Sequence, residues 1–444
     1  MPDATYSFPK DFLWGTATAG YQVEGQSTHT DFWQWEQGAG RIAQGQKSGR
    51  ACDWCEGQRW QEDFDRAAAD GHTAHRLSVE WSRVEPTAAR WDEDALDHYR
   101  QMVKGLRARG LEPMVTLHHF VNPLWVAERN AWETGEAIRL FEQYVRKVVG
   151  ALREDVTLWC TINEPNVYMY NGWVADIFPP GKKDIGLALR VAQNLLKAHA
   201  VAYHTIHTLQ PSALVGLPIH FRPIEPARPR SALDRWVAQK QFNLFSSLFP
   251  DAIRTGAIRQ LFGRPIPIPE AKGTLDFFGL NYYSSDLARF DLRYPGELFG
   301  RRSFPPGAEP DDLRFNASFP PGFYWSLEWA HQFGLPIYVT ENGIGDAQDK
   351  LRPRFLITHL HQLWRAVNFK WDVRGYFHWS LVDNFEWGLG WTHPFGLYAM
   401  DRETLVRTPR RSAQLYAEIC KSRSILSDMV ARCAPDLLET MFPG

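Results

Sequence analysis

The sequence contains few cysteines, no long apolar run and almost no net charge, and each shortage excludes a class of protein. Five cysteines among 444 residues do not make the disulfide framework of small secreted domains. No run of about 18 apolar residues is present, so no membrane-spanning helix is expected. A net charge of −2 gives no reason to expect nucleic acid or a membrane surface as a partner. The sequence therefore indicates a soluble, folded protein.

Targeting and cofactor motifs are also scarce. Residues 1–10 lack a charged start followed by an apolar run, so we expect no secretory signal and a cytoplasmic protein with unpaired thiols. Cys52 and Cys55 form a Cys-x-x-Cys pair, but a zinc site needs two further ligands and no second pair follows. No Gly-x-Gly-x-x-Gly or P-loop pattern for a nucleotide is present. We expect neither a metal nor an organic cofactor.

Tryptophan, by contrast, is abundant, with 19 residues in the chain. Aromatic faces stack on the apolar C–H faces of sugar rings, so this excess suits a carbohydrate site, although most of these side chains are expected in the core. A sugar is therefore the kind of small-molecule partner that the composition favours.

Short apolar strands alternate with amphipathic helices along the whole chain, which is typical of parallel β/α architecture. The eight predicted strands match a single (β/α)8 TIM barrel with long βα loops, in which residues 1–444 form one domain. The longest irregular region, about Ser285 to Pro321, is expected to be an active-site loop after the sixth strand. The predicted strands are Phe12–Ala17, Thr73–Ser78, Glu112–Leu117, Val156–Ile162, Leu214–Pro218, Phe277–Tyr282, Ile337–Thr340 and Val373–Trp379, and the clearest predicted helices are Asp92–Arg109, Glu136–Leu152, Ile185–Thr208, Phe323–Gln332 and Arg354–Asn368.

Two short segments, Thr161–Pro165 and Thr340–Gly343, each place a glutamate just after a predicted strand. Alone, each could be an ordinary turn, since Asn, Pro and Gly favour turns. In a barrel, however, the carboxyl ends of all strands meet at one mouth. Glycoside hydrolysis needs two carboxyl groups on opposite sides of the sugar, so we expect Glu164 and Glu341 to share one pocket. The same rule brings further residues to this mouth, namely Gln22, Arg76, His119, Asn163, Asn281, Tyr283, Trp379 and Glu386.

Six motifs follow one another in order along the chain. They are Phe12–Gly25 (FLWGTATAGYQVEG), Arg76–Arg83 (RLSVEWSR), Thr161–Pro165 (TINEP), Gly279–Ser284 (GLNYYS), Thr340–Gly343 (TENG) and Trp379–Trp387 (WSLVDNFEW). Each is weak or moderate evidence by itself, but six in order are highly specific. The chain resembles glycoside hydrolase family 1, the retaining β-glucosidase family, from Phe8 to about Tyr416. Residues 417–444 are then a C-terminal extension of a single catalytic domain.

The resemblance implies different roles for the two glutamates. Glu164 matches the general acid/base of the family and Glu341 its nucleophile. Arg76 and Tyr283 match the residues that keep the nucleophile ionised, and Asn281 completes the catalytic group. Carboxyl groups in retaining pairs lie roughly 5–5.5 Å apart. A glutamate rather than a glutamine at position 164 implies an O-glycosidase instead of a thioglucosidase.

The resemblance also assigns the recognition of the sugar. Asn163 is expected to hold the 2-hydroxyl and Glu386 the 4- and 6-hydroxyls, so Glu386 would repel a 6-phosphate. Trp379 matches the platform on which the ring stacks. The residues that match the hydrogen-bonding set are Gln22, His119, Asn163, Glu386 and Trp387.

One position departs from the family pattern. The family usually has His-Trp where this chain has His119-Phe120, so one indole hydrogen bond to the sugar edge is missing and specificity is expected to broaden. His118 and His119 point to opposite faces of a strand, which disfavours a shared metal. Trp33 and Trp325 are further candidates for the aglycone side.

These observations together predict a retaining exo-β-glycosidase that works by double displacement through a covalent glycosyl-enzyme. Its expected substrates are β-D-glucosides, and also β-D-galactosides and β-D-fucosides, as small glycosides or oligosaccharides. Two alternatives stay open: a transglycosidase on the same scaffold, and a non-catalytic sugar-binding protein.

Overall fold

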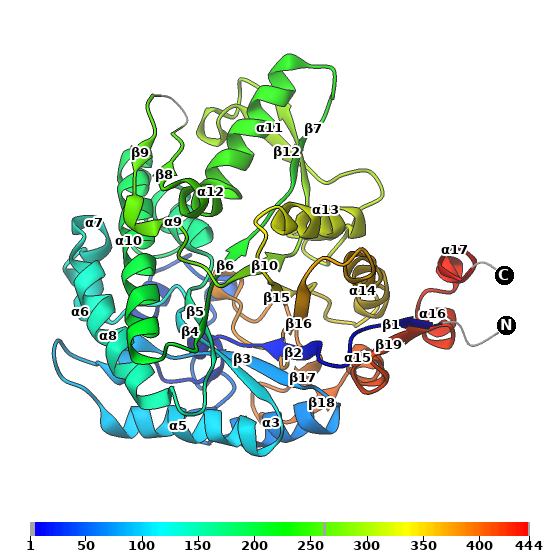
Figure 1. Cartoon of the computed structure of the whole chain (residues 1–444), viewed down its shortest axis with the longest axis horizontal. Coiled ribbons are helices and arrows are strands. Elements are labelled where there is room, and N and C mark those ends of the chain that lie inside the picture. Colours follow the sequence, from blue (N-terminus) through cyan, green and yellow to red (C-terminus); the bar gives the residue numbers. More distant parts are fainter. Residues whose placement is uncertain (1–4, 261–262, 443–444) are drawn as a thin grey trace.

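Eight parallel strands close into a barrel in the computed structural model, which describes residues 5–260 and 263–442 (Figure 1). Barrel strands that follow one another in the chain are also neighbours in the barrel. Because these neighbours are parallel, each connection returns along the outside of the barrel, where the helices lie. The (β/α)8 prediction is confirmed. The barrel strands are β2 (Leu13–Ala17), β3 (Ala74–Ser78), β4 (Glu112–His118), β5 (Leu158–Ile162), β6 (Leu214–His220), β10 (Phe277–Tyr282), β15 (Ile337–Asn342) and β16 (Val373–Trp379).

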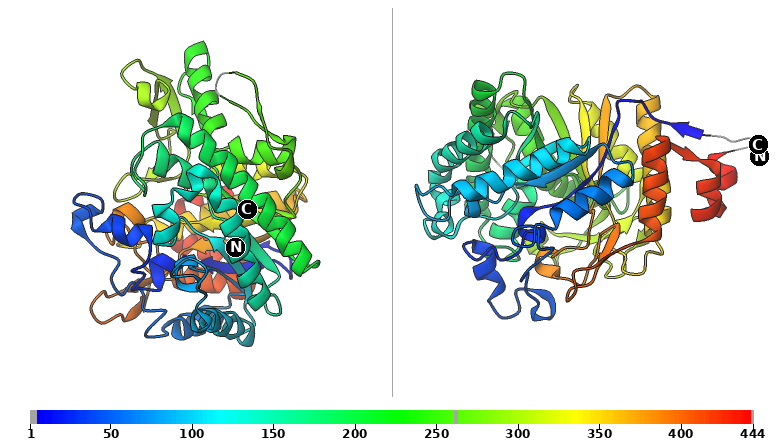
Figure 2. Two further views of the ribbon diagram at one scale, coloured as in Figure 1. Left: turned by 90° about the vertical axis from the view of Figure 1, so that its left-hand side faces the viewer. Right: turned by 90° about the horizontal axis from the view of Figure 1, so that it is seen from below.

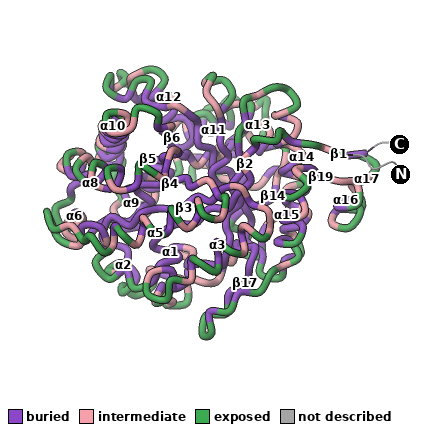
Figure 3. Tube along the Cα trace, turned by 60° about the horizontal axis from the view of Figure 1, so that its bottom comes forward, coloured by how far each residue is buried: buried purple, intermediate pink, exposed green. Residues whose placement is uncertain are grey.

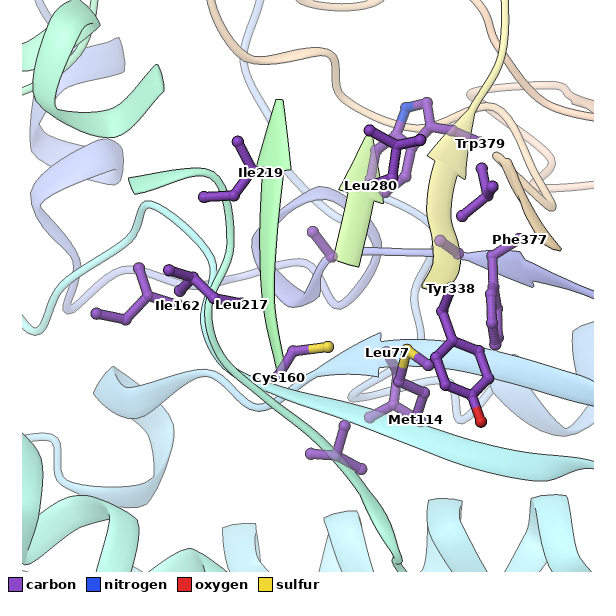
Figure 4. Packing of buried hydrophobic residues seen from close by; sticks show 14 of the residues in the cluster. Leu77, Met114, Cys160, Ile162, Leu217, Ile219, Leu280, Tyr338, Phe377 and Trp379 are labelled. Atoms are coloured by element: carbon purple, nitrogen blue, oxygen red, sulfur yellow. The ribbon is translucent and has the colours of Figure 1, made fainter. Parts of the chain in front are cut away.

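The barrel strands are buried because they are short runs dominated by apolar residues. Every residue of β5 and of β10 is buried. Figure 4 shows how side chains from successive strands pack together, among them Leu77, Cys160, Leu217, Leu280 and Phe377. This packed interior holds the ends of the strands in fixed positions.

The helices around the barrel turn their apolar faces inward. In α8 (Glu136–Leu152), Leu140, Tyr144 and Val148 are buried at a spacing of four residues. Figure 3 shows buried segments in the centre of the molecule and exposed segments at its periphery. None of the helices in the two described ranges is long and apolar enough to cross a membrane. The other long helices are α3 (Trp60–Ala69), α5 (Glu93–Ala108), α9 (Pro165–Trp173), α10 (Ile185–Leu209), α11 (Ala232–Phe245), α12 (Leu248–Thr255), α13 (Pro320–His331), α14 (Arg352–Asn368) and α15 (Arg411–Ser422).

Short elements fill the connections between these strands and helices. The short helices are α1 (Gly20–Val23), α2 (Asp31–Glu36), α4 (Trp81–Val84), α6 (Leu124–Glu128) and α7 (Ala131–Thr134), with 3-10 turns at η1 (Ala43–Gly45), η2 (Pro269–Ala271), η3 (Pro295–Glu297) and η4 (Trp387–Leu389). The short strands β8 (Ala257–Ile258) and β17 (Tyr398–Met400) pair with β9 (Ile266–Pro267) and β18 (Arg407–Pro409) respectively.

The region after the sixth barrel strand differs from the prediction. Instead of one irregular loop, residues 285–321 contain β11 (Asp286–Phe290), β12 (Gly300–Ser303), β13 (Glu309–Pro310) and β14 (Ala317–Ser318). In Figure 1, α11 rises above the barrel together with β7 (Ile224–Pro226) and β12, which join β11 in a three-stranded sheet. Such short strands, broken by Pro and Gly, carry no clear alternation for a sequence pattern to reveal.

Two strand ends were predicted two residues too early. β15 continues to Asn342, so Glu341 lies inside the strand and not after it as predicted. β6 likewise continues beyond Pro218 to His220. Both extensions lengthen the barrel on the side of the predicted pocket.

The first and last labelled elements, β1 (Thr5–Ser7) and α17 (Leu438–Met441), lie together on one side of the molecule (Figures 1 and 2). There β1 pairs antiparallel with β19 (Ser424–Leu426). The chain then forms α16 (Ser427–Cys433), η5 (Pro435–Leu437) and α17. The Tyr6 ring stacks on Phe442 with 4.5 Å between ring centroids, so the C-terminal segment packs on the first strand.

Candidate active site

A cavity of about 500 Å³ opens at the carboxyl ends of the barrel strands. Gln22, Arg76 and Asn281 lie directly behind its lining and hydrogen-bond to it. The structure thus brings all the predicted catalytic and sugar-binding residues to one place. Those that line the cavity are His119, Asn163, Glu164, Tyr283, Glu341, Trp379, Glu386 and Trp387.

Glu341 is held by two short hydrogen bonds. It is only 3% exposed. Its Oε1 accepts a bond of 2.5 Å from Arg76 Nη1, and its Oε2 accepts one of 2.6 Å from Tyr283 OH. Both oxygens act as acceptors, which is the pattern of an ionised carboxylate.

Glu164 lies at the junction of β5 and α9. Its backbone is left-handed, with φ 41° and ψ 59°, and Pro165 begins the helix, where no backbone N–H is needed. Its Oε1 accepts a hydrogen bond of 2.8 Å from Asn281 Nδ2 and lies 3.4 Å from His220 Nδ1. Among the described residues, none donates a hydrogen bond to its Oε2. That oxygen is therefore free to carry a proton toward a ligand.

A chain of hydrogen bonds connects the two carboxyl groups. Arg76 binds Glu341 and also donates through Nη2 to Asn163 Oδ1 at 2.7 Å. Asn281 Nδ2 lies 3.3 Å from the same Asn163 oxygen and donates to Glu164. Because Arg76 comes from β3 and Asn281 from β10, strands on opposite parts of the barrel fix the positions of both glutamates.

The protonation of Glu341 differs in one respect from the expectation. The pKa of Glu341 is raised to about 7, chiefly by burial and also by the charge of Glu164, while Arg76 and Tyr283 act in the opposite direction. The predicted contacts are present, but desolvation outweighs them. The hydrogen bonds from Arg76 and Tyr283 nevertheless favour the ionised form of Glu341.

Gln22 and Glu386 form a second polar group on the far side of the cavity. Gln22 Nε2 donates to Asn384 Oδ1 at 2.8 Å and to Phe385 O at 2.9 Å, and it lies 3.3 Å from Glu386 Oε2. Gln22 Oε1 is buried and has no hydrogen-bond partner among the described residues. Burial raises the pKa of Glu386 to about 8. Both side chains thus present acceptor oxygens that suit sugar hydroxyl groups.

His119 offers a hydrogen-bond donor. Asn163 Nδ2 donates to His119 Nε2 at 3.0 Å, and Asn163 keeps that orientation because its other end accepts from Arg76. We therefore assign the ring hydrogen to Nδ1, which is buried and has no partner in the described part of the chain. Burial lowers the pKa of His119 well below its usual value, so the ring is neutral.

Aromatic rings surround this donor. The His119 ring stacks near Trp379 and Trp387, with centroid distances of 6.0 and 5.9 Å. Phe120 lines the cavity and packs on Trp387 at 5.1 Å and on Phe178 at 5.4 Å. Apolar ring faces therefore lie beside the hydrogen-bonding groups, which is the combination that a sugar ring needs.

The prediction for Trp33 and Trp325 is wrong. Within the described residues, neither side chain lines the cavity. Trp325 packs on Phe221 and Phe242, with 5.8 Å between ring centroids in each case. Trp35 lines the cavity instead, because residues two apart in a helix face different directions.

Some cavity residues were not predicted. His220 ends β6, and the strand-end rule would have selected it had that strand been extended beyond Pro218. Tyr170 from α9 and Arg302 from β12 also line the cavity. They belong to none of the six motifs, and Arg302 lies in the region where the sequence shows no periodicity.

The described residues contain no group of three or more His, Cys, Asp or Glu side chains arranged to hold a metal ion. His118 Nε2 lies 3.1 Å from Asn122 Oδ1, whereas His119 contacts Asn163. All five cysteines, each within the described ranges, are free. The groups that face the cavity are thus suited to proton transfer, nucleophilic attack and hydroxyl recognition.

Comparisons with known proteins agree with this arrangement. The model of the family described as glycosyl hydrolase family 1 matches residues 4–425. The chain is 31% identical to "Beta-glucosidase A" of Thermotoga maritima, over 94% of this chain and 98% of the relative. It is 29% identical to "Beta-galactosidase" of Pyrococcus woesei, with coverages of 94% and 98%. Among solved structures, a "beta-glycosidase from Pyrococcus horikoshii" superposes with a TM-score of 0.90 at 37% identity, covering 97% of this chain and 98% of that one.

Proposed function

The chain belongs to glycosyl hydrolase family 1 and is a glycoside hydrolase, and from this membership we propose that it is a retaining exo-β-glycosidase. Its proposed substrates are β-D-glucosides, with β-D-galactosides and β-D-fucosides in addition. The observation that supports the proposal is the pair of carboxyl groups joined by hydrogen bonds through Arg76, Asn163 and Asn281. Glu341 accepts hydrogen bonds from Arg76 and Tyr283, while Oε2 of Glu164 has no donor among the described residues. The whole chain acts as one catalytic domain, with residues 417–444 as its C-terminal extension.

In the first step the Glu341 carboxylate attacks the anomeric carbon. The bond from that carbon to the aglycone oxygen breaks, and Glu164 transfers its proton to the leaving oxygen. The product is an α-linked glycosyl ester on Glu341 and a free alcohol. Arg76 and Tyr283 hold the attacking carboxylate in place until the bond forms.

In the second step the ester is hydrolysed. Glu164 gave up its proton in the first step and stays ionised because Glu341 no longer carries a charge, so it takes a proton from water. The resulting hydroxide attacks the anomeric carbon, the ester bond breaks, and the sugar leaves with its original β configuration. The expected carboxyl separation of roughly 5–5.5 Å for such a pair remains our prediction.

The sugar is held by polar and aromatic groups around the carboxyl pair. Asn163 binds the 2-hydroxyl, Glu386 and Gln22 accept from the 4- and 6-hydroxyls, and His119 donates through Nδ1. The ring lies on Trp379, beside Trp387. Phe120 donates no hydrogen bond at that edge, which supports tolerance of more than one configuration in the sugar.

The stereochemistry of the first product tests the mechanism. We expect NMR to detect the β-anomer of glucose first when a nitrophenyl β-glucoside is hydrolysed. Glu341→Gly should lose activity by orders of magnitude, and azide should restore turnover with an α-glucosyl azide as the product. An α-anomer from the unmodified enzyme would contradict a retaining mechanism.

A panel of nitrophenyl β-glycosides that differ at the 2-, 4- and 6-positions tests the choice of sugar. Hydrolysis of glucoside, galactoside and fucoside is expected. The transglycosidase alternative predicts glycosides as main products when an acceptor alcohol is in excess, and the sugar-binding alternative predicts no turnover at all.

A further inference from the structure

The outer half of the cavity has an apolar wall. Val167 and Tyr170 project from one face of α9, just after Glu164, and Phe245 closes the same side. At the mouth, Ile177 and Phe315 also line the cavity although they are 51% and 53% exposed. Large apolar side chains that remain exposed around a pocket mark a surface that a ligand covers. This half lies beyond Glu164, where the leaving group departs.

One positive charge on this wall is not neutralised. Arg222 binds Asp286 through two hydrogen bonds of 2.7 and 3.0 Å, so it already satisfies both oxygens of that carboxylate. Arg302 is a second cation on the same Asp286, at the longer distance of 3.6 Å. Two guanidinium groups thus share one carboxylate, and both line the cavity.

The Arg302 guanidinium has N–H donors that make no hydrogen bond with the described residues. Its Nε donates to Gln241 Oε1 at 3.2 Å, and among the described residues its Nη2 has no hydrogen-bond partner. Its side chain is 26% exposed, whereas that of Asp286 is 3% exposed, so the guanidinium is the accessible member of the cluster. Tyr170 lies on the same wall, and its hydroxyl makes no hydrogen bond with a described residue.

Two other charged residues of the cavity neutralise each other. Arg41 and Asp176, which also line the cavity, form an ion pair of 2.8 Å. Glu297 is exposed on η3 and does not belong to the lining. The accessible cation on the leaving-group wall is therefore Arg302, whose carboxylate partner Asp286 is already bound by Arg222.

We infer that the aglycone of the natural substrate is an extended apolar group that carries an acidic group, and that Arg302 is the residue that selects for it. The apolar part lies along Val167, Phe245 and Phe315, and the acid accepts hydrogen bonds from Arg302 and Tyr170. This inference rests on the proposed β-glycosidase function, because the aglycone is defined only for a glycoside that is cleaved at Glu164.

A matched set of substrates tests the charge preference. The β-glucosides of ω-hydroxybutanoic, ω-hydroxyhexanoic and ω-hydroxyoctanoic acid are compared with their methyl esters, so that each pair keeps the same length and a nearly equal leaving group. For the best chain length, kcat/KM should be about tenfold higher for the acid than for the ester, which corresponds to one charge-assisted hydrogen bond. The advantage should fall as salt is added.

Two variants assign this preference to Arg302. Arg302→Met should remove the advantage of the acid, so that acid and ester are cleaved with similar kcat/KM. Arg301→Met is the matched control: Arg301 is the exposed neighbour on β12, so the charge change is the same but the side chain points to the other face. Loss of the advantage in both variants, or in neither, would overturn the role of Arg302.

The apolar part is tested with alkyl β-glucosides from methyl to octyl. We expect kcat/KM to rise by about two- to threefold for each methylene that the wall covers. Phe315→Ser should flatten this rise, whereas Phe369→Ser, at a 60% exposed apolar position outside the cavity lining, should not. If the unmodified enzyme cleaved every glucoside but showed no higher kcat/KM for the acid than for its ester, the inference would be refuted while the proposed function would stand. Failure to cleave any β-glucoside would refute the proposed function instead.

Discussion

The carboxyl group of Glu341 experiences opposing influences on its ionisation. Burial raises its pKa to about 7, while Arg76 and Tyr283 favour the ionised form. Each of the two hydrogen bonds reaches a different oxygen. Because this balance lies near neutral pH, the loss of one donor should be visible in the pH dependence of the reaction.

Tyr283→Phe removes one of these donors. A hydrogen bond to the charged form lowers the pKa of a carboxyl group, so its loss raises the pKa of Glu341 above its present value. Ionised Glu341 is then populated only at higher pH. The acidic limb of the kcat/KM profile should move up by about one to two pH units, since a bond to a charged group contributes about 1.5–3 kcal/mol.

Tyr282→Phe provides the comparison. The neighbouring Tyr282 hydroxyl contacts Ser285 Oγ and Phe319 O instead of a catalytic carboxyl group. Its loss should leave the acidic limb in place. An equal movement in both variants would mean that Tyr283 acts through folding and not through Glu341.

The motif residues could be predicted, whereas their energetics could not. Glu164 and Tyr283 each lie within a short motif at the end of a barrel strand, so the strand-end rule identifies them, whereas Arg76 lies inside β3 and is identified through its motif. The raised pKa of Glu341 depends on how completely the folded barrel excludes water, and no local pattern encodes that exclusion. Arg302 belongs to none of the motifs and lies in a strand of only four residues. Its proposed role in binding the aglycone depends on its contact with Asp286, which the sequence does not reveal.

Strand packing in the barrel requires close approach at particular glycines. A Cβ at Gly279 would lie 2.8 Å from Pro218 Cα and 3.0 Å from Pro218 N. Gly279 pairs with Pro218 between β10 and β6. Since the neighbouring atoms belong to the backbone, they cannot move without displacing β6.

Gly279→Ala should therefore destabilise the barrel, by about 1–3 kcal/mol on the basis of overpacked cores. It should also lower kcat/KM, because Asn281 lies two residues further along the same strand and binds Glu164. Thermal unfolding and the nitrophenyl β-glucoside assay measure the two effects. A variant as stable as the unmodified enzyme would show that the two strands can separate at no cost.

Gly150→Ala is the matched substitution in a helix. A Cβ at this position in α8 meets nothing within 4 Å, so alanine should stabilise the protein by about 0.5–1 kcal/mol. The opposite signs expected at the two glycines separate a steric effect from the general effect of removing glycine.

The strands and helices of the barrel were predictable because each is long enough to show its period. The predicted helix Glu136–Leu152 and the predicted strand Phe277–Tyr282 agree with α8 and β10 in both bounds. The three-stranded sheet of β7, β11 and β12 was missed because its strands have between three and five residues. Their pairing depends on contacts between distant segments and not on local alternation.

The chain ends are joined by contacts that lie outside the barrel strands. Beyond the β1–β19 pair, Tyr6 packs on His361 at 4.8 Å and on Trp364 at 4.4 Å. Arg354 of α14 forms an ion pair of 2.6 Å with Asp436. None of these residues, all of which the structure describes, lines the active-site cavity. The C-terminal segment is therefore expected to contribute to stability without contacting the substrate.

Truncation after Leu426 tests this expectation. It keeps β19 but removes residues 427–444, which exposes the face of Tyr6 that stacks on Phe442. Because burial of one large apolar side chain contributes about 1.5–3 kcal/mol, the midpoint of thermal unfolding should fall while KM for a nitrophenyl β-glucoside stays unchanged. Truncation after Arg410 should prevent folding instead, since α15 buries Leu415 and Ile419 and Tyr416 OH donates to Gly15 O of β2 at 2.7 Å. A raised KM after truncation at Leu426 would mean that the C-terminal segment lies within reach of the substrate.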